Sequence, residues 1–251
     1  MVSNGRKSTD IVSITGTVTG RPRNIMDDYP VVFVPSGLRG ESNSVYFGNI
    51  PVGYRHTKAI GLYNPTDRPI RVEAVVTGGD RCTVTAPASL APGAKGQLLI
   101  TCDLKSSPTY GPFASRAELR TDGAVVAAIR ADGVATPDFT SLTPEQRRAT
   151  PRADMSETFR YFDKAARGKP LSHSFTVTNG GSRALTIESV TCSSPQISCH
   201  ASARNIEPKG SATLTVTLTP AGAGRCSEEV TVVTNDPTEP VIRLRAVANV
   251  K

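Results

Sequence analysis

Residues 171–179 read Leu-Ser-His-Ser-Phe-Thr-Val-Thr-Asn, so apolar and polar side chains alternate along this stretch. A period of two is typical of a strand that has one face in a core and the other in water. The same alternation occurs in residues 211–219, which read Ser-Ala-Thr-Leu-Thr-Val-Thr-Leu-Thr. The two stretches therefore predict half-buried β-strands.

Asn179, the last residue of the first stretch, belongs to a skeleton that occurs twice in the chain. Five residues of one copy, namely Phe162, Gly168, Asn179, Ile187 and Val190, each lie 115 positions after Phe47, Gly53, Asn64, Val72 and Val75. Self-similarity at a fixed spacing is a strong fold signal, and a spacing of this length corresponds to a whole small domain. The sequence therefore predicts a tandem array of one module.

Both copies contain further short alternating segments separated by turn signals. These segments are 57–63, 69–76, 96–104, 116–121 and 124–131 in the first copy, and 184–192, 228–234 and 241–249 in the second. Stretches such as Asn64-Pro65-Thr66-Asp67 and Asn235-Asp236-Pro237 are typical of turns. Roughly seven short strands per copy, with no helix between them, predict an all-β protein of two immunoglobulin-like β-sandwiches.

The repeat also predicts the domain boundaries. We expect sandwich 1 at residues 41–135 and sandwich 2 at residues 159–251, with linkers at 19–40 and 136–158. The second linker contains Thr143-Pro144-Glu145-Gln146, where a capping Thr followed by Pro predicts the start of a short helix.

Residues 8–18 resemble the closing strand of the first copy. Gly16 in this segment and Gly133 in the closing strand are 117 positions apart. We therefore expect residues 1–18 to hold the last strand of a preceding module that this sequence does not include. The alternative is an N-terminal strand that pairs with sandwich 1.

Composition excludes several classes of protein. The formal net charge is +7, but the basic residues are scattered, and aromatic residues make up only 5% of the chain, which disfavours the stacking surface of a nucleic-acid binder. No apolar run is long enough to cross a membrane, and residues 1–7 are too polar for a secretory signal peptide. If the chain is complete as given, this pattern indicates a cytoplasmic protein.

Several motifs resemble a bacterial family of unknown function. They are the segment from Phe162 through His173-Ser-Phe-Thr-Val-Thr-Asn179-Gly180 to Val190, then Ile206-Glu-Pro208-Lys-Gly210 and Thr234-Asn235-Asp236-Pro237. The members of that family are immunoglobulin-like modules related to major sperm protein and ciliary ASH domains. The resemblance implies a location in the Gram-negative envelope, in the periplasm or at the outer membrane, and it implies no activity. Members often carry a Cys-Gly-Cys-Thr-like segment where this chain has Cys192-Ser193-Ser194-Pro195.

Cys82 and Cys102 lie ten residues on either side of Pro92. If Leu90–Gly93 forms a hairpin turn, the two cysteines face each other across an antiparallel pair, close enough for a disulfide. The alternative is a reduced, buried pair.

The second copy has a different set of cysteines. Cys199 aligns with Cys82 after a two-residue gap, and Leu218 aligns with Cys102, so that disulfide is not repeated. Cys192 and Cys226 are a reasonable pair on neighbouring strands, and Cys192 with Cys199 is the rival pair. One thiol of the five cysteines remains free in either case.

No residues match a catalytic, cofactor or metal signature. Cys192, Cys199, His200 and Cys226 lack the paired close spacing of a zinc site, and Cys199 and His200 are strand neighbours that point to opposite faces. The acidic residues in or beside turns (Asp122, Asp236, Glu228 and Glu229) show no sign of a shared cleft. We expect no enzymatic activity and no cofactor.

Two functions fit these observations. The first is a non-enzymatic extracytoplasmic module that supports or binds envelope proteins through its exposed edges and loops. The second is a periplasmic chaperone that acts by strand addition. Neither requires nucleic acid, and a membrane contact would need an anchor outside this sequence.

Overall fold

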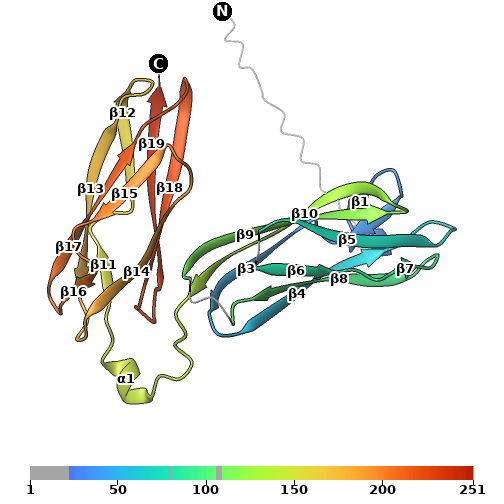
Figure 1. Ribbon diagram of the computed structural model, residues 1–251, viewed down its shortest axis with the longest axis horizontal. Helices are drawn as coiled ribbons and strands as arrows, with labels where there is room; N and C mark the ends of the chain where they lie inside the picture. The colour runs from blue at the N-terminus through green and yellow to red at the C-terminus, as the bar shows by residue number, and fades with distance from the viewer. Residues whose placement is uncertain (1–22, 80, 106–108, 251) are drawn as a thin grey trace, which may run out of the picture.

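The computed structural model describes residues 23–79, 81–105 and 109–250 of the chain. The expected strand remnant in residues 1–18 lies outside these ranges, as do residues 19–22 of the expected first linker. Among the described residues, strands predominate and form two β-sandwiches, domain 1 and domain 2, joined by a loop that carries one short helix (Figure 1). The predicted fold class, two tandem immunoglobulin-like sandwiches, is confirmed.

Domain 1 consists of two five-stranded sheets. The first sheet has the order β1 (Val31–Phe33), β2 (Leu38–Gly40), β4 (Arg55–Tyr63), β8 (Lys95–Asp103) and β6 (Cys82–Thr85). The second has the order β3 (Ser44–Pro51), β10 (Ala124–Thr136), β9 (Gly111–Thr121), β5 (Ile70–Gly78) and β7 (Ser89–Leu90).

Domain 2 repeats this arrangement. One sheet has the order β11 (Ala153–Met155), β13 (Leu171–Asn179), β17 (Ser211–Leu218) and β15 (Ile197–Ala201). The other has the order β12 (Phe159–Ala165), β19 (Val241–Val250), β18 (Gly224–Thr234), β14 (Leu185–Cys192) and β16 (Asn205–Ile206). Each strand of domain 2 thus has a counterpart at the same place in domain 1, and β1 is an addition to domain 1.

Two segments that we expected to be linkers contribute strands. In the segment 19–40, β1 and β2 join the first sheet of domain 1, and Phe33 and Leu38 are buried in its core. In the segment 136–158, β11 pairs with β13. Three-residue strands are too short to show a period of two, so the pattern did not reveal them. Their position is explained by the need to cover the backbone of β4 and β13, which would otherwise be exposed sheet edges.

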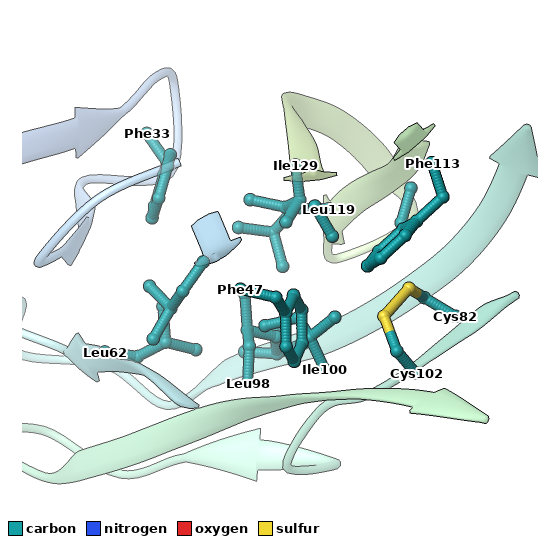
Figure 2. Packing of buried hydrophobic residues seen from close by; sticks show 14 of the residues in the cluster. Phe33, Phe47, Leu62, Cys82, Leu98, Ile100, Cys102, Phe113, Leu119 and Ile129 are labelled. Carbon is teal, nitrogen blue, oxygen red and sulfur yellow. A yellow bond between two sulfur atoms is a disulfide. The ribbon is translucent and has the colours of Figure 1, made fainter. Parts of the chain in front are cut away.

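Each sandwich has its own apolar core, formed by the inward-facing residues of its two sheets. Figure 2 shows the core of domain 1, in which Phe47 and Leu62 pack with Ile100, Leu119 and Ile129. The core of domain 2 includes Phe175, Leu185, Leu214, Val230 and Leu244 among its buried residues. Burial of such side chains contributes about 1.5–3 kcal/mol each relative to exposure.

The repeated asparagine is a buried polar residue in both domains. Asn64 and Asn179 are fully buried, and each side-chain amide group donates to two backbone carbonyls: Arg68 and Leu90 in domain 1, Arg183 and Ile206 in domain 2. The amide oxygen of each residue accepts one N–H of the following turn, from Thr66 in domain 1 and from Gly181 in domain 2. Its second donor differs: the Thr66 hydroxyl in domain 1 and the Arg152 N–H in domain 2. The repeated Asn therefore fixes the corner after β4 and β13 in much the same way twice.

The repeated glycine has a conformational role. Gly53 and Gly168 have φ values of +90° and +70°, in the left-handed region that side chains disfavour. Both residues lie before the strand that leads to the buried Asn, so the repeat preserves a turn.

The linker between the domains passes through helix α1 (Pro144–Arg148), which begins with a capping box formed by Thr143 and Gln146. A short 3₁₀ helix, η1 (Ile25–Asp27), precedes β1. No helix in the described part of the chain is long and apolar enough to cross a membrane.

Candidate functional site

The two sandwiches contact each other through their β3–β10–β9 and β14–β18–β19 strands. Arg243 on β19 donates a hydrogen bond of 3.1 Å to the Tyr46 hydroxyl on β3, and its Nε lies 3.9 Å from Glu229. Gly111, at the start of β9, faces Thr191 and Ser189 of β14 so closely that a Cβ there would lie 3.0 Å from the Thr191 hydroxyl. Domain 1 therefore packs closely against domain 2 at this point.

A groove of about 320 Å³ lies beside this contact. Its lining from domain 1 is Tyr46, Pro112, Phe113, Ala114, Asp132, Gly133 and Val134, and from domain 2 it is Glu229, Thr231 and Arg243. Arg243 is already engaged with Tyr46 and Glu229, and the rest of the lining is mainly apolar or backbone. The two carboxylates in the lining, Asp132 and Glu229, are each paired with an arginine, Arg130 and Arg243 respectively. The lining residues include no Ser, Cys or His, so they offer no nucleophile with a histidine base.

The four acidic residues noted in the sequence do not meet. Asp122 and Asp236 each accept backbone N–H groups of their own corner, from Arg71 in one case and from Ala153 and Thr238 in the other. Glu228 accepts a hydrogen bond from the Ser193 hydroxyl, whereas the neighbouring Glu229 lies near Arg243. These carboxylates support turns and strand contacts and do not form a pair for acid–base chemistry.

Cys82 and Cys102 are bonded to each other in a disulfide with a Cα–Cα distance of 4.0 Å. They are directly opposite in the antiparallel β6–β8 pair, at one end of the core shown in Figure 2. The connection between these strands is not the simple hairpin that we expected, because β7 crosses to the other sheet and pairs with β5. The disulfide therefore closes a segment that visits both sheets.

The alignment of cysteines between the domains needs a correction of two residues. Ile197 lies opposite Leu218 in the β15–β17 pair, where Cys82 lies opposite Cys102 in domain 1. Cys199 lies opposite Val216, which is the position of Val84 opposite Ile100. Domain 2 thus has a buried apolar pair in place of the disulfide.

Neither of the two pairs considered for domain 2, Cys192 with Cys226 or Cys192 with Cys199, is bonded in the structure, and all three thiols are free. The strands of Cys192 and Cys226 are neighbours, but Cys192 is opposite Val230, four residues along β18 from Cys226. At about 3.3 Å per residue this offset is about 13 Å, well beyond the reach of a disulfide. Cys226 instead approaches the side-chain oxygen of Gln196.

Cys199, the third free cysteine, is close to Cys192. Burial raises the pKa of the Cys199 thiol to about 11 and also raises the pKa of Cys192. The two thiols are near enough to interact electrostatically, and Cys192 is one further cause of the raised pKa of Cys199. Within the described residues, no group of three or more His, Cys, Asp or Glu side chains has the geometry of a metal site.

An exposed pair of aromatic residues was not identified from the sequence. Phe159 and Tyr161 on β12 are 51% and 42% exposed, and β12 is the edge strand of its sheet. The repeat contains this signal, because Tyr161 lies 115 residues after Tyr46, next to the repeated Phe47 and Phe162. The structure shows that the tyrosine before each phenylalanine faces outward.

Taken together, the strand order and the duplicated corners define a protein of two immunoglobulin-like sandwiches in series. Residues 154–250, which are domain 2 and less than half of the chain, match the model of a family described as "Protein of unknown function (DUF1573)". The comparison with curated proteins gives no match.

Two solved structures show how far the likeness extends. The chain is 17% identical to a protein of unknown function from Porphyromonas gingivalis W83, over 84% of this chain and 99% of that one, with a TM-score of 0.59. It is 13% identical to an ASH/PapD-like domain of human CEP192, over 46% of this chain and 98% of that one, with a TM-score of 0.35. The first likeness supports the fold, including the presence of both sandwiches, and carries no activity.

Proposed function

We propose that the chain is a non-enzymatic, extracytoplasmic module of the cell envelope that binds another protein through the β12 edge of domain 2. The observation that carries this proposal is the place of Tyr161. Tyr161 on β12 lies opposite Val247 of β19 in a parallel pair, as Tyr46 on β3 lies opposite Asp132 of β10. The two tyrosines therefore occupy equivalent positions on equivalent edge strands.

In domain 1 this position already makes a contact between protein domains. The Tyr46 hydroxyl accepts the hydrogen bond from Arg243 of domain 2. In domain 2 the equivalent Tyr161 has no sandwich packed against it among the described residues, and it is exposed together with Phe159. Exposed aromatic side chains are enriched at protein interfaces because they combine a large apolar area with a polar end.

The backbone of β12 offers a second means of binding. An edge strand presents unpaired N–H and C=O groups, which an extended segment of another protein can pair with by strand addition. The exposed Arg245, which lies opposite Phe159 on β19, favours a partner segment that carries carboxylates. The same edge would serve a chaperone that acts by strand addition, which is the second candidate function.

The disulfide of domain 1 supports the compartment in this proposal. Disulfides form and persist in oxidising compartments such as the periplasm and are rare in the cytosol. The Cys82–Cys102 disulfide therefore supports the proposal of an extracytoplasmic location.

The test is capture of partners from an envelope extract with the wild-type chain and with a Phe159→Ser, Tyr161→Ser double variant. We expect the wild type to retain one or a few folded proteins in fixed ratio, and the double variant to lose most of that binding. A Val125→Ser variant is the matched control, because Val125 is 53% exposed on a different strand, in domain 1.

The outcomes separate the candidates. Many unfolded clients, released by the double variant, would instead favour the chaperone. Equal binding by the wild type, the double variant and the control would contradict both functions, because neither would then use β12.

A further inference from the structure

A hollow of about 570 Å³ lies at the end of domain 2 where the linker from α1 joins it (Figure 1). Three of its lining residues are cationic, and no lining residue is acidic. The cations are Arg148 from the last turn of α1, Arg152 from the linker just before β11, and Lys209 from the corner between β16 and β17. This basic hollow is completed by Thr150, Gly180, Gly181, Ser182 and Pro208.

Two glycines allow the linker to lie against this corner. A Cβ at Gly180 would collide with the side chains of Arg152 and Asp154, and a Cβ at Gly181 would collide with the Thr150 carbonyl. The N–H of Gly180 also donates to the Arg152 carbonyl at 2.9 Å. Close backbone packing therefore fixes Arg152 beside the turn.

Lys209 has a backbone conformation that favours glycine. Its φ is +67°, and the equivalent residue of domain 1 is Gly93, whose φ is +70°. The backbone shows the equivalence, because the N–H of Lys209 donates to the Asn179 carbonyl as the N–H of Gly93 donates to the Asn64 carbonyl. Domain 2 thus has a lysine where the fold favours glycine. Disfavoured conformations of this kind cluster at functional sites.

The positive charge of the basic hollow is only partly offset. Arg148 is exposed, and among the described residues its guanidinium has no hydrogen bond or ion pair. The Lys209 ammonium donates only to the Gly180 carbonyl, at 3.4 Å. Arg152 donates to the Asp154 carboxylate from Nε at 3.0 Å and from Nη2 at 2.8 Å. Among the lining residues and their ion-pair partners, one carboxylate therefore offsets one of three positive charges.

The donors of the basic hollow suit carboxylates better than a compact phosphate. Phosphate sites in proteins commonly use several free backbone N–H groups. Here the N–H groups of Gly180, Gly181 and Ser182 all donate to acceptors within the protein. The free donors are therefore side-chain cations. Arg152 already holds the Asp154 carboxylate with its guanidinium, which is the geometry that arginine favours for this group.

We propose that the basic hollow binds an acidic segment of another protein, with carboxylates of that segment against Arg148 and Lys209. The hollow shares no residue with β12, so this site does not depend on the function proposed for that edge. The cations are exposed, and binding should therefore weaken as the salt concentration rises.

The test measures binding of a short fluorescent peptide rich in Glu to the full chain by anisotropy, with a peptide that has Gln in place of Glu as the uncharged control. An Arg148→Ala, Lys209→Gly variant should bind the acidic peptide about fivefold more weakly than the wild type, since two exposed ion pairs are lost. An Arg167→Ala, Lys169→Ala variant is the matched control. It removes the same charge at the other end of β13 and should bind as the wild type does.

Inorganic phosphate and vesicles that contain anionic lipid are tested against the wild type in the same way. Tighter binding of either one than of the acidic peptide would overturn the proposal. Absence of binding of the acidic peptide by the wild type, or equal weakening in the two double variants, would overturn it as well.

Lys209→Gly alone separates binding from folding. Because Gly93 occupies the equivalent position, this variant should melt at the temperature of the wild type or higher, while it binds the acidic peptide more weakly. A lower melting temperature with unchanged binding would show that Lys209 serves the fold and would contradict its role in the site.

Discussion

Domain 1 closes the end of its β6–β8 pair with the Cys82–Cys102 disulfide, whereas domain 2 fills the equivalent positions with Ile197 and Leu218. Both pairs are buried at the end of a sandwich core. One fold therefore accepts a covalent link or an apolar contact at the same place. The two domains therefore share the fold at this place, whereas the residues that fill the end of the core differ.

The strongest shared feature is the buried asparagine, and removing it should have the largest effect. Asn179→Ala leaves the carbonyls of Arg183 and Ile206 and the N–H groups of Gly181 and Arg152 without their partner. We expect domain 2 to lose about 4 kcal/mol in free energy of unfolding, measured by urea denaturation.

The comparison is sharpened by the same change in domain 1. Asn64→Ala should destabilise domain 1 by a similar amount, because three of its hydrogen bonds match those of Asn179 and the Thr66 hydroxyl supplies a fourth. Asn205→Ala, on the exposed side of β16, is the control and should change stability by less than about 0.5 kcal/mol. If only one domain responds to loss of its Asn, the two corners are not equivalent.

The disulfide should account for the next largest effect. It links residues 20 positions apart, so replacing both cysteines by Ala should cost domain 1 about 3 kcal/mol through the added entropy of the unfolded chain. Thermal unfolding followed by circular dichroism, compared with and without reductant, measures this loss.

Exchanging the two pairs tests the comparison directly. A chain with Cys82→Ile and Cys102→Leu carries the apolar pair of domain 2 in domain 1, and it should recover part of the stability lost in the Ala variant. If this variant is no more stable than the Ala variant, the end of the domain 1 core cannot accommodate the Ile and Leu side chains.

A smaller effect is expected from Asp236, which has no buried counterpart in domain 1. Its carboxylate accepts N–H groups of Ala153, Thr238 and Glu239 and thereby fixes β11 to the corner after β18. Asp236→Asn should cost about 2 kcal/mol, since the amide would turn an N–H group toward one of these donors. Hydrogen exchange should show loss of protection confined to β11, and Asp67→Asn in an exposed turn should show none.

The smallest effect is expected at the contact between the domains. Tyr46→Phe removes the hydrogen bond from Arg243 and should change the free energy of unfolding of either domain by less than about 1 kcal/mol. The relative orientation of the domains should nevertheless become more variable, as measured by small-angle scattering of the full chain. Unchanged scattering would mean that the packing of Gly111 against β14 is sufficient to hold the domains.

Much of the fold could be predicted from the sequence because the long strands carry clear alternation. The expected segments 57–63, 171–179 and 211–219 correspond to β4, β13 and β17. The short strands β1, β2 and β11 could not be predicted, since three residues carry almost no period and their pairing depends on an exposed edge elsewhere in the chain.

The cysteine pattern shows a similar limit. The spacing about Pro92 predicted that Cys82 and Cys102 face each other, which is correct. The two strands are joined through β7, which pairs with β5 in the other sheet, and not through the expected hairpin turn. In domain 2 the register of β14 against β18 separates Cys192 from Cys226, and a bulge between Ile187 and Ser189 contributes to that register. Such a bulge leaves no signal in a single sequence. The outward tyrosines, by contrast, were visible in the repeat.

The central claim is that the edge presented by Tyr161 binds a protein, as the equivalent edge at Tyr46 does within the chain. The most direct measurement places a photo-reactive amino acid at position 161 and, in a second chain, at position 125, and irradiates both in intact envelopes. The account predicts a discrete cross-linked species containing one folded partner from position 161 and none from position 125. The absence of a species specific to position 161 would contradict the account.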